Sequence, residues 1–118
     1  MRLRTLLAAG LLTFGATAAF AGASSSQFEA YQPDPALRTA PTSELEARVR
    51  RSCAVVQARM QNAAETSFER PCGCYAKTTL RALDASEIAA YRTTGYFNDS
   101  ARAKALNAID SCKLPRPI

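Results

Sequence analysis

Residues 71–75 read Pro71-Cys72-Gly73-Cys74-Tyr75, and this stretch decides the fold because it holds two of the chain's four cysteines. The other two, Cys53 and Cys112, flank it at a distance on either side. If Cys72 and Cys74 lie in the first turn of a helix, two positions apart, their side chains point about 200° from each other. Each sulfur can then face a different neighbouring helix. We therefore expect two disulfides that join the central CGC to both flanks.

Four cysteines allow three pairings. A Cys72–Cys74 bridge would close a very small, strained loop and is the least favoured. We prefer Cys53–Cys72 with Cys74–Cys112, but the spacing leaves the crossed pairing, Cys53–Cys74 with Cys72–Cys112, open. Either pairing requires the segment 65–71 to fold back along the first helix, because Cys53 lies in the middle of that helix.

The first predicted helix begins at Ser43, where Ser43-Glu44-Leu45-Glu46 has the pattern of a capping box. It frays between Ala64 and Phe68, and Pro71 ends any continuation. Its apolar residues recur at helical spacing and form one stripe, which comprises Leu45, Val49, Cys53, Val56, Met60 and Ala63 or Ala64.

Three more helices follow. The second comes after Pro71, and the third runs from an Asp84–Glu87 cap to Gly95, which closes it as a left-handed cap. Asn98 or Asp99 caps the fourth helix, which runs from Ser100 to Cys112. No stretch alternates as a strand would, so we predict an all-α fold, a small four-helix domain stapled by two disulfides.

The N-terminal part has the composition of an export signal. Arg2 and Arg4 precede an apolar stretch, and Ala19-Phe20-Ala21 provides a cleavage site, so we expect residues 1–21 to be removed, with cleavage after Ala23 as a second register. Residues 22–42 are rich in Ser, Ala and Pro and predict a flexible arm, whose large apolar groups are Phe28, Tyr31 and Leu37. The helical domain then takes residues 43–114 and a short tail takes residues 115–118.

The run from Phe68 to Lys77, with single cysteines at 53 and 112 and the Asp84–Glu87 cap, resembles small exported proteobacterial proteins that share a C…CxC…C pattern. The similarity covers about 60 residues. It implies an exported helical domain with disulfides and lends no activity. The chain has few Lys but many Arg and Ala. This compositional bias favours a bacterial periplasm, or secretion, over a eukaryotic secretory route.

Composition excludes several function classes. The chain has no His, which removes Ser-His-Asp and Cys-His catalysis and His-containing zinc sites. Its five Gly are too scattered for a phosphate loop. The cysteine spacing does not match zinc knuckles, and no pair of carboxylates is placed in a cleft by the sequence. We therefore expect no enzyme, no catalytic residue, no metal and no cofactor.

The formal net charge is +5, from 15 basic and 10 acidic residues. Loss of Arg2 and Arg4 with the signal would leave 13 − 10 = +3, a modest charge that says little about partners. No aromatic residues interleave the arginines of the first helix, so we expect no nucleic-acid binding. We expect no membrane span after cleavage. The leading hypothesis is a non-enzymatic envelope interaction or stress-related module that binds an unknown envelope protein through Arg48, Arg50, Arg51 and Arg59, or through Phe28 and Tyr31. The alternative hypothesis is thiol-disulfide exchange by Cys72-Gly73-Cys74, because a thiol near a helix N-terminus has a lowered pKa.

Overall fold

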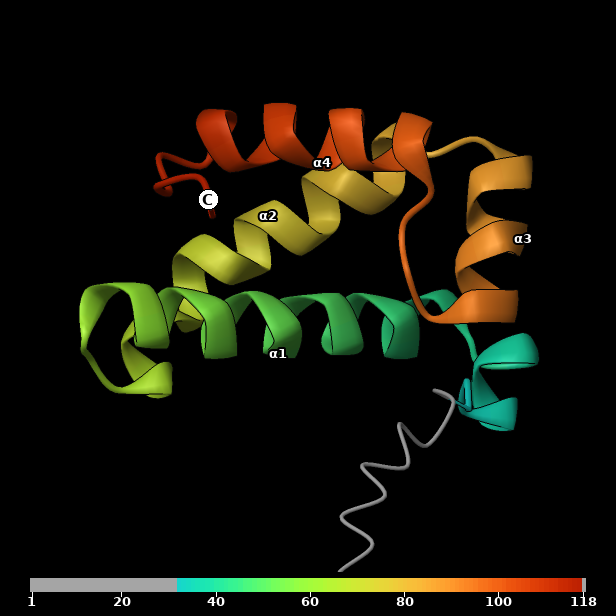
Figure 1. The fold of residues 1–118 in the computed structure, drawn as a ribbon, viewed down its shortest axis with the longest axis horizontal. Coiled ribbons are helices and arrows are strands. Elements are labelled where there is room, and N and C mark those ends of the chain that lie inside the picture. The colour runs from blue at the N-terminus through green and yellow to red at the C-terminus, as the bar shows by residue number, and fades with distance from the viewer. Residues whose placement is uncertain (1–31, 118) are drawn as a thin grey trace, which may run out of the picture. The chain divides into compact units, whose positions relative to one another are not determined.

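The computed structural model describes residues 32–117 (Figure 1). These residues form two short 3-10 helices and four α-helices: η1 (Pro35–Arg38), α1 (Thr42–Gln61), η2 (Glu65–Phe68), α2 (Glu69–Ala82), α3 (Ala85–Thr94) and α4 (Asp99–Ser111). The described residues contain no strand, so the all-α prediction with four helices is confirmed. The predicted signal peptide (1–21) and the first part of the arm, with Phe28 and Tyr31, lie outside the described residues.

Helix α1 differs from its prediction at both ends. It begins at Thr42 with Pro41 as N-cap, so Ser43 lies inside the first turn and makes no capping hydrogen bond. Pro41 starts the helix one residue early because its carbonyl already accepts from the amides of Glu44 and Leu45. The helix ends at Gln61, earlier than expected, because Asn62 adopts the left-handed conformation (φ 48°) that asparagine tolerates better than most residues.

Helix α2 begins two residues before Pro71 rather than after it, and the CGC motif lies within the helix as expected. The short η2 leads directly into α2 at Glu69, and Pro71 is the third residue of the helix. Proline is tolerated there because amides of the first turn have no partner within the helix. Cys72, Gly73 and Cys74 are therefore fully helical, and 65–71 folds back beside α1 as the pairing requires.

The ends of α3 and α4 follow the sequence closely. Asp84 and Glu87 form the predicted capping box of α3, and Gly95 ends the helix with φ 77°. Asn98 caps α4 by accepting from the Ala101 amide. At the other end the amide of Leu114 donates to the Ile109 carbonyl across Lys113, which has φ 57°, and this closes α4 as a Schellman turn.

The second part of the predicted flexible arm is folded. Leu37 on η1 is 2 % exposed and Ala40 is 5 % exposed, and both pack into the same cluster as Leu45. The guanidinium of Arg92 on α3 donates to the carbonyls of Leu37 and Ala40, at 3.0 and 2.6 Å. The prediction of flexibility is therefore wrong for these residues, because an arginine distant in sequence binds their backbone.

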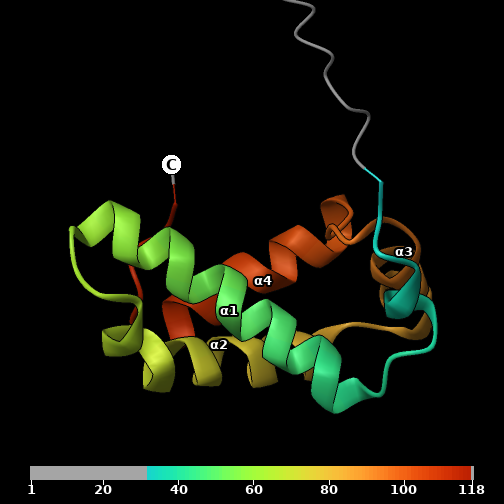
Figure 2. The same cartoon turned by 90° about the horizontal axis from the view of Figure 1, so that it is seen from below.

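Helix α2 crosses obliquely between α1 and α4, and α3 lies with η1 at one end of the helical domain (Figure 1). Seen from below, α1 passes in front of α4, and α2 lies beside α1 (Figure 2). One core cluster surrounds Leu45, Val49 and Leu80, and a second surrounds Phe68, Cys72 and Ile109. Within residues 32–117, α2 is the α-helix that packs most extensively against both α1 and α4, so the sides of α1 and α4 away from α2 are not covered by another of these helices.

Candidate functional site

Two disulfides hold α2 to its neighbours. Cys53 on α1 is bonded to Cys72, and Cys74 is bonded to Cys112 at the end of α4, with Cα–Cα distances of 5.6 and 5.9 Å. The preferred pairing is confirmed, and the crossed one is wrong. All four sulfurs are used, so the described residues contain no free thiol that could act as a metal ligand or nucleophile.

The two bridges differ in their surroundings. Cys53 and Cys72 are 7 % and 0 % exposed, whereas Cys74 is exposed and Cys112 is half-buried. Cys72 and Cys74 are not bonded to each other. One bridge joins α2 to α1, and the other joins α2 to the end of α4. The Cys74–Cys112 bridge holds the C-terminal end of α4 against α2, where it can be reached from solvent.

An apolar groove of about 280 Å³ lies between α1 and α4 on the side away from α2. Residues of the α3–α4 loop and of the C-terminal tail line it, and these two segments lie at opposite ends of α4 (Figure 1). None of its lining side chains is charged, and most are apolar or aromatic; they belong to Val49, Ser52, Cys53, Val56, Gln57, Tyr75, Tyr91, Gly95, Tyr96, Phe97, Ile109 and Pro117.

One wall of the groove is a face of α1 that the sequence assigned to the core. Val56 and Met60 continue the predicted stripe, yet they are 40 % and 41 % exposed. The core side of this part of α1 is taken by Ala54, Gln57 and Ala58 instead. The predicted burial of Val56 and Met60 is therefore wrong, because α2 packs against a neighbouring face of α1, and Val56 lines the groove.

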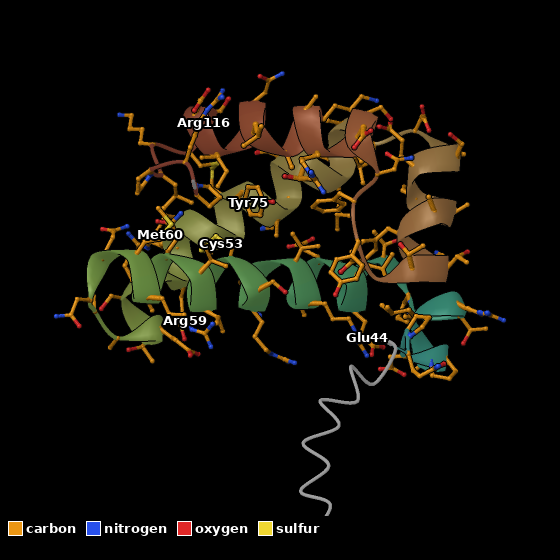
Figure 3. The ribbon with its side chains drawn as sticks, viewed as in Figure 1. Glu44, Cys53, Arg59, Met60, Tyr75 and Arg116 are labelled. Carbon is orange, nitrogen blue, oxygen red and sulfur yellow. A yellow bond between two sulfur atoms is a disulfide. The ribbon has the colours of Figure 1, made fainter. Side chains whose placement is uncertain are left out.

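Aromatic side chains line the floor and one end of the groove. Figure 3 shows Tyr75 on α2 in the space between α1 and α4, with Cys53 on the adjacent side of α1. Burial raises the pKa of Tyr75, so its hydroxyl stays protonated at neutral pH. The rings of Tyr91 and Phe97 are in contact, with centroids 5.1 Å apart. The floor therefore offers ring faces and hydroxyl groups, but no charge.

The C-terminal tail closes the other end. Gln57 on α1, only 1 % exposed, donates to the carbonyl of Pro115 at 2.9 Å and accepts from Gln61. The guanidinium of Arg116 donates twice to the carboxylate of Asp110 on α4. These contacts fix the tail to α1 and α4, and Pro117 of the tail lines the groove.

The basic residues on α1 do not form one free cationic face. Arg48 is ion-paired with Asp34, which precedes η1. Arg50 and Arg51 line a polar depression together with Glu65, Thr66 and Glu69. Arg59 is exposed and points away from α2 and α4 (Figure 3). Partner binding through these arginines stays a prediction, and acidic side chains from other elements lie beside three of the four.

Sequence reasoning missed most of the groove. Gln57, Tyr96 and Phe97 gave no signal that they meet across the fold, and Ser52 looked like an ordinary surface residue. The predicted stripe of α1 did include Val49, Cys53 and Val56, which line the groove, but the stripe did not indicate that its C-terminal part is exposed. Among the described residues, no helix has both the length and the apolar character needed to cross a bilayer. Searches of protein-family models, curated proteins and solved structures returned no match to this chain.

Proposed function

We propose that this protein is a non-enzymatic binding module that works after export and holds an apolar group in the groove between α1 and α4. The observation that carries the proposal is the uncharged lining of the groove, which combines an aliphatic wall with an aromatic floor. Ligand sites have this character, a mostly apolar concavity with few polar groups. Val56 and Tyr96 are 40 % and 58 % exposed where they line the groove, so a bound apolar group would remove some of their apolar surface from water.

Export is supported by the two disulfides, which persist in an oxidising compartment such as the bacterial periplasm or the extracellular medium. They also support the binding role. Each bridge ties one wall of the groove to α2, through Cys53 for α1 and Cys112 for α4. The groove would therefore keep its shape when empty, and a preformed site loses less free energy on binding.

The test is titration of the oxidised protein with the uncharged fluorophore N-phenylnaphthylamine, whose emission rises in apolar surroundings. We expect saturable binding with one site per chain. Val56→Glu places a carboxylate in the groove, and we expect it to weaken binding about tenfold or more because the charge would have to lose water. Val55→Glu is the matched control, since Val55 is the next residue and does not line the groove.

Circular dichroism of both variants checks that the helices remain. The proposal would be overturned if Val56→Glu bound the fluorophore as tightly as the wild-type protein does. It would also be overturned if Val55→Glu lost as much affinity as Val56→Glu.

A further inference from the structure

We propose that the group held in the groove is a single linear aliphatic chain, and that the ligand is a single-chain amphiphile whose polar head stays in solvent. This inference rests on the proposed function and narrows its ligand class. It depends on the length, the volume and the charge of the groove, each of which restricts the occupant.

Length is set by α1. The wall runs from Val49 to Gln57, which at the rise of an α-helix is about 12 Å. Residues of the α3–α4 loop and Pro117 of the tail also line the groove, and these two segments lie at opposite ends of α4 (Figure 1). The groove is therefore an elongated channel along one helix, and an elongated apolar molecule fills it better than a compact one.

Volume limits the size of the occupant. A cavity of about 150 Å³ holds one benzene ring. The groove, at about 280 Å³, is nearly twice as large. It therefore encloses about eleven carbon atoms if they pack as densely as in that cavity, and the remaining part of a larger ligand stays in solvent. This size fits one medium-length alkyl or acyl chain, and it is too small for the two chains of a bilayer lipid.

Charge determines where the head lies. Among residues 32–117, no charged side chain lines the groove, and the amide of Gln57 is hydrogen-bonded to Pro115 and Gln61. A charged group inside would lose water without meeting an opposite charge among the lining residues. The chain therefore lies inside, and the head lies outside, on the open side opposite α2.

The experiment uses primary alcohols, which carry a linear chain and an uncharged head. Binding of hexanol, octanol, decanol and dodecanol to the full oxidised protein is followed by the amide signals of Val56, Tyr75 and Ile109 in NMR titrations. We expect affinity to rise about fourfold for each added methylene up to decanol, and to rise less from decanol to dodecanol. Adamantanol, with the ten carbons of decanol in a compact cage, should bind at least tenfold more weakly than decanol.

A flat dependence on chain length, or adamantanol binding as tightly as decanol, would overturn the linear-chain inference. If N-phenylnaphthylamine still binds and Val56→Glu still weakens it, the proposed function survives that result. If Val56→Glu binds decanol as tightly as the wild-type protein does, the chain is not in the groove and the inference fails in the same way. The direct NMR readout does not depend on the fluorophore, so each proposal can fail separately.

Discussion

Lys104 on α4 donates to the carboxylate of Glu87 on α3, and Glu87 is only 1 % exposed. The same carboxylate accepts from the Asp84 amide and from the Ser100 hydroxyl, each at 2.9 Å. Glu87 therefore fixes the start of α3 to α4. This junction holds the α3–α4 loop, and that loop forms one end of the groove.

The Glu87 junction predicts an acid-sensitive stability. The hydrogen bond from the Asp84 amide, and then that from Lys104, lower the pKa of Glu87 below its ordinary value of 4.5. Because its native pKa is depressed, the stabilisation is present above the unfolded pKa and is lost as pH falls from about 4.5 towards the native value. Thermal unfolding at neutral pH and at pH 3 measures this loss.

Glu87→Gln tests the assignment, because a glutamine cannot titrate. The variant should be less stable than the wild-type protein at neutral pH and should lose less stability on acidification. Asp110→Asn is the matched control, since the Asp110–Arg116 pair is about half exposed on both sides and exposed ion pairs contribute little. Equal acid sensitivity of Glu87→Gln and wild type would show that Glu87 is not the titrating group.

Gly73 predicts a stabilising substitution. It lies inside α2, where glycine costs about 0.5–1 kcal/mol relative to alanine. A Cβ at this position would meet Cδ of Arg50 at 3.9 Å, an ordinary contact, so Gly73→Ala should raise the free energy of unfolding by about that amount. Gly95→Ala should instead lower it by about 1–2 kcal/mol, since Gly95 has φ 77°. Denaturant unfolding of both variants measures the difference, and a destabilised Gly73→Ala would mean that α1 and α2 approach more closely than described.

Arg92 is predicted to hold the segment 34–41 on the domain. Arg92→Met removes the donors to Leu37 and Ala40 and should cost about 1–3 kcal/mol, because these carbonyls bond to a charged group. Amide hydrogen exchange should then speed up at Leu37 more than at residues of α2. Arg81→Met, an exposed arginine in the last turn of α2, is the control. Unchanged exchange in the Arg92 variant would refute the clamp.

The disulfides are predicted to open in a fixed order. Reductant reaches the exposed Cys74 before the buried Cys53–Cys72 bridge, so graded reduction with alkylation and peptide mapping should label Cys74 and Cys112 first. Loss of the Cys74–Cys112 bridge should also weaken binding of N-phenylnaphthylamine, because Ile109 would no longer be held in place. Transient formation of a Cys72–Cys74 bridge at mild potential would instead favour the thiol-exchange hypothesis.

Local signals in the sequence predicted the parts of the fold that local interactions determine. The Asp84–Glu87 box, the left-handed Gly95 and the Asn98 cap each act within four residues, and each is found as expected. The angle between Cys72 and Cys74 on one helix predicted that each would bond to a different flanking cysteine. It left two pairings open, and the fold decides between them.

The groove depends on residues that are distant in sequence, so no local pattern could reveal it. Val56 has the same spacing as a core residue, and only the position of α2 decides that it faces outward. The folded state of 34–41 likewise depends on Arg92, which is more than fifty residues away. Gln57 looked like a surface residue, but the carbonyl of Pro115 stabilises it in the interior.

The most direct test of the proposed site is to locate a bound chain by intermolecular nuclear Overhauser effects. The full oxidised protein, with labelled valine and isoleucine methyl groups, is saturated with decanol. We predict contacts from the chain protons to the methyl groups of Val49, Val56 and Ile109 and to the ring of Tyr75. Contacts to methyl groups elsewhere in the protein, or none at saturation, would contradict the account.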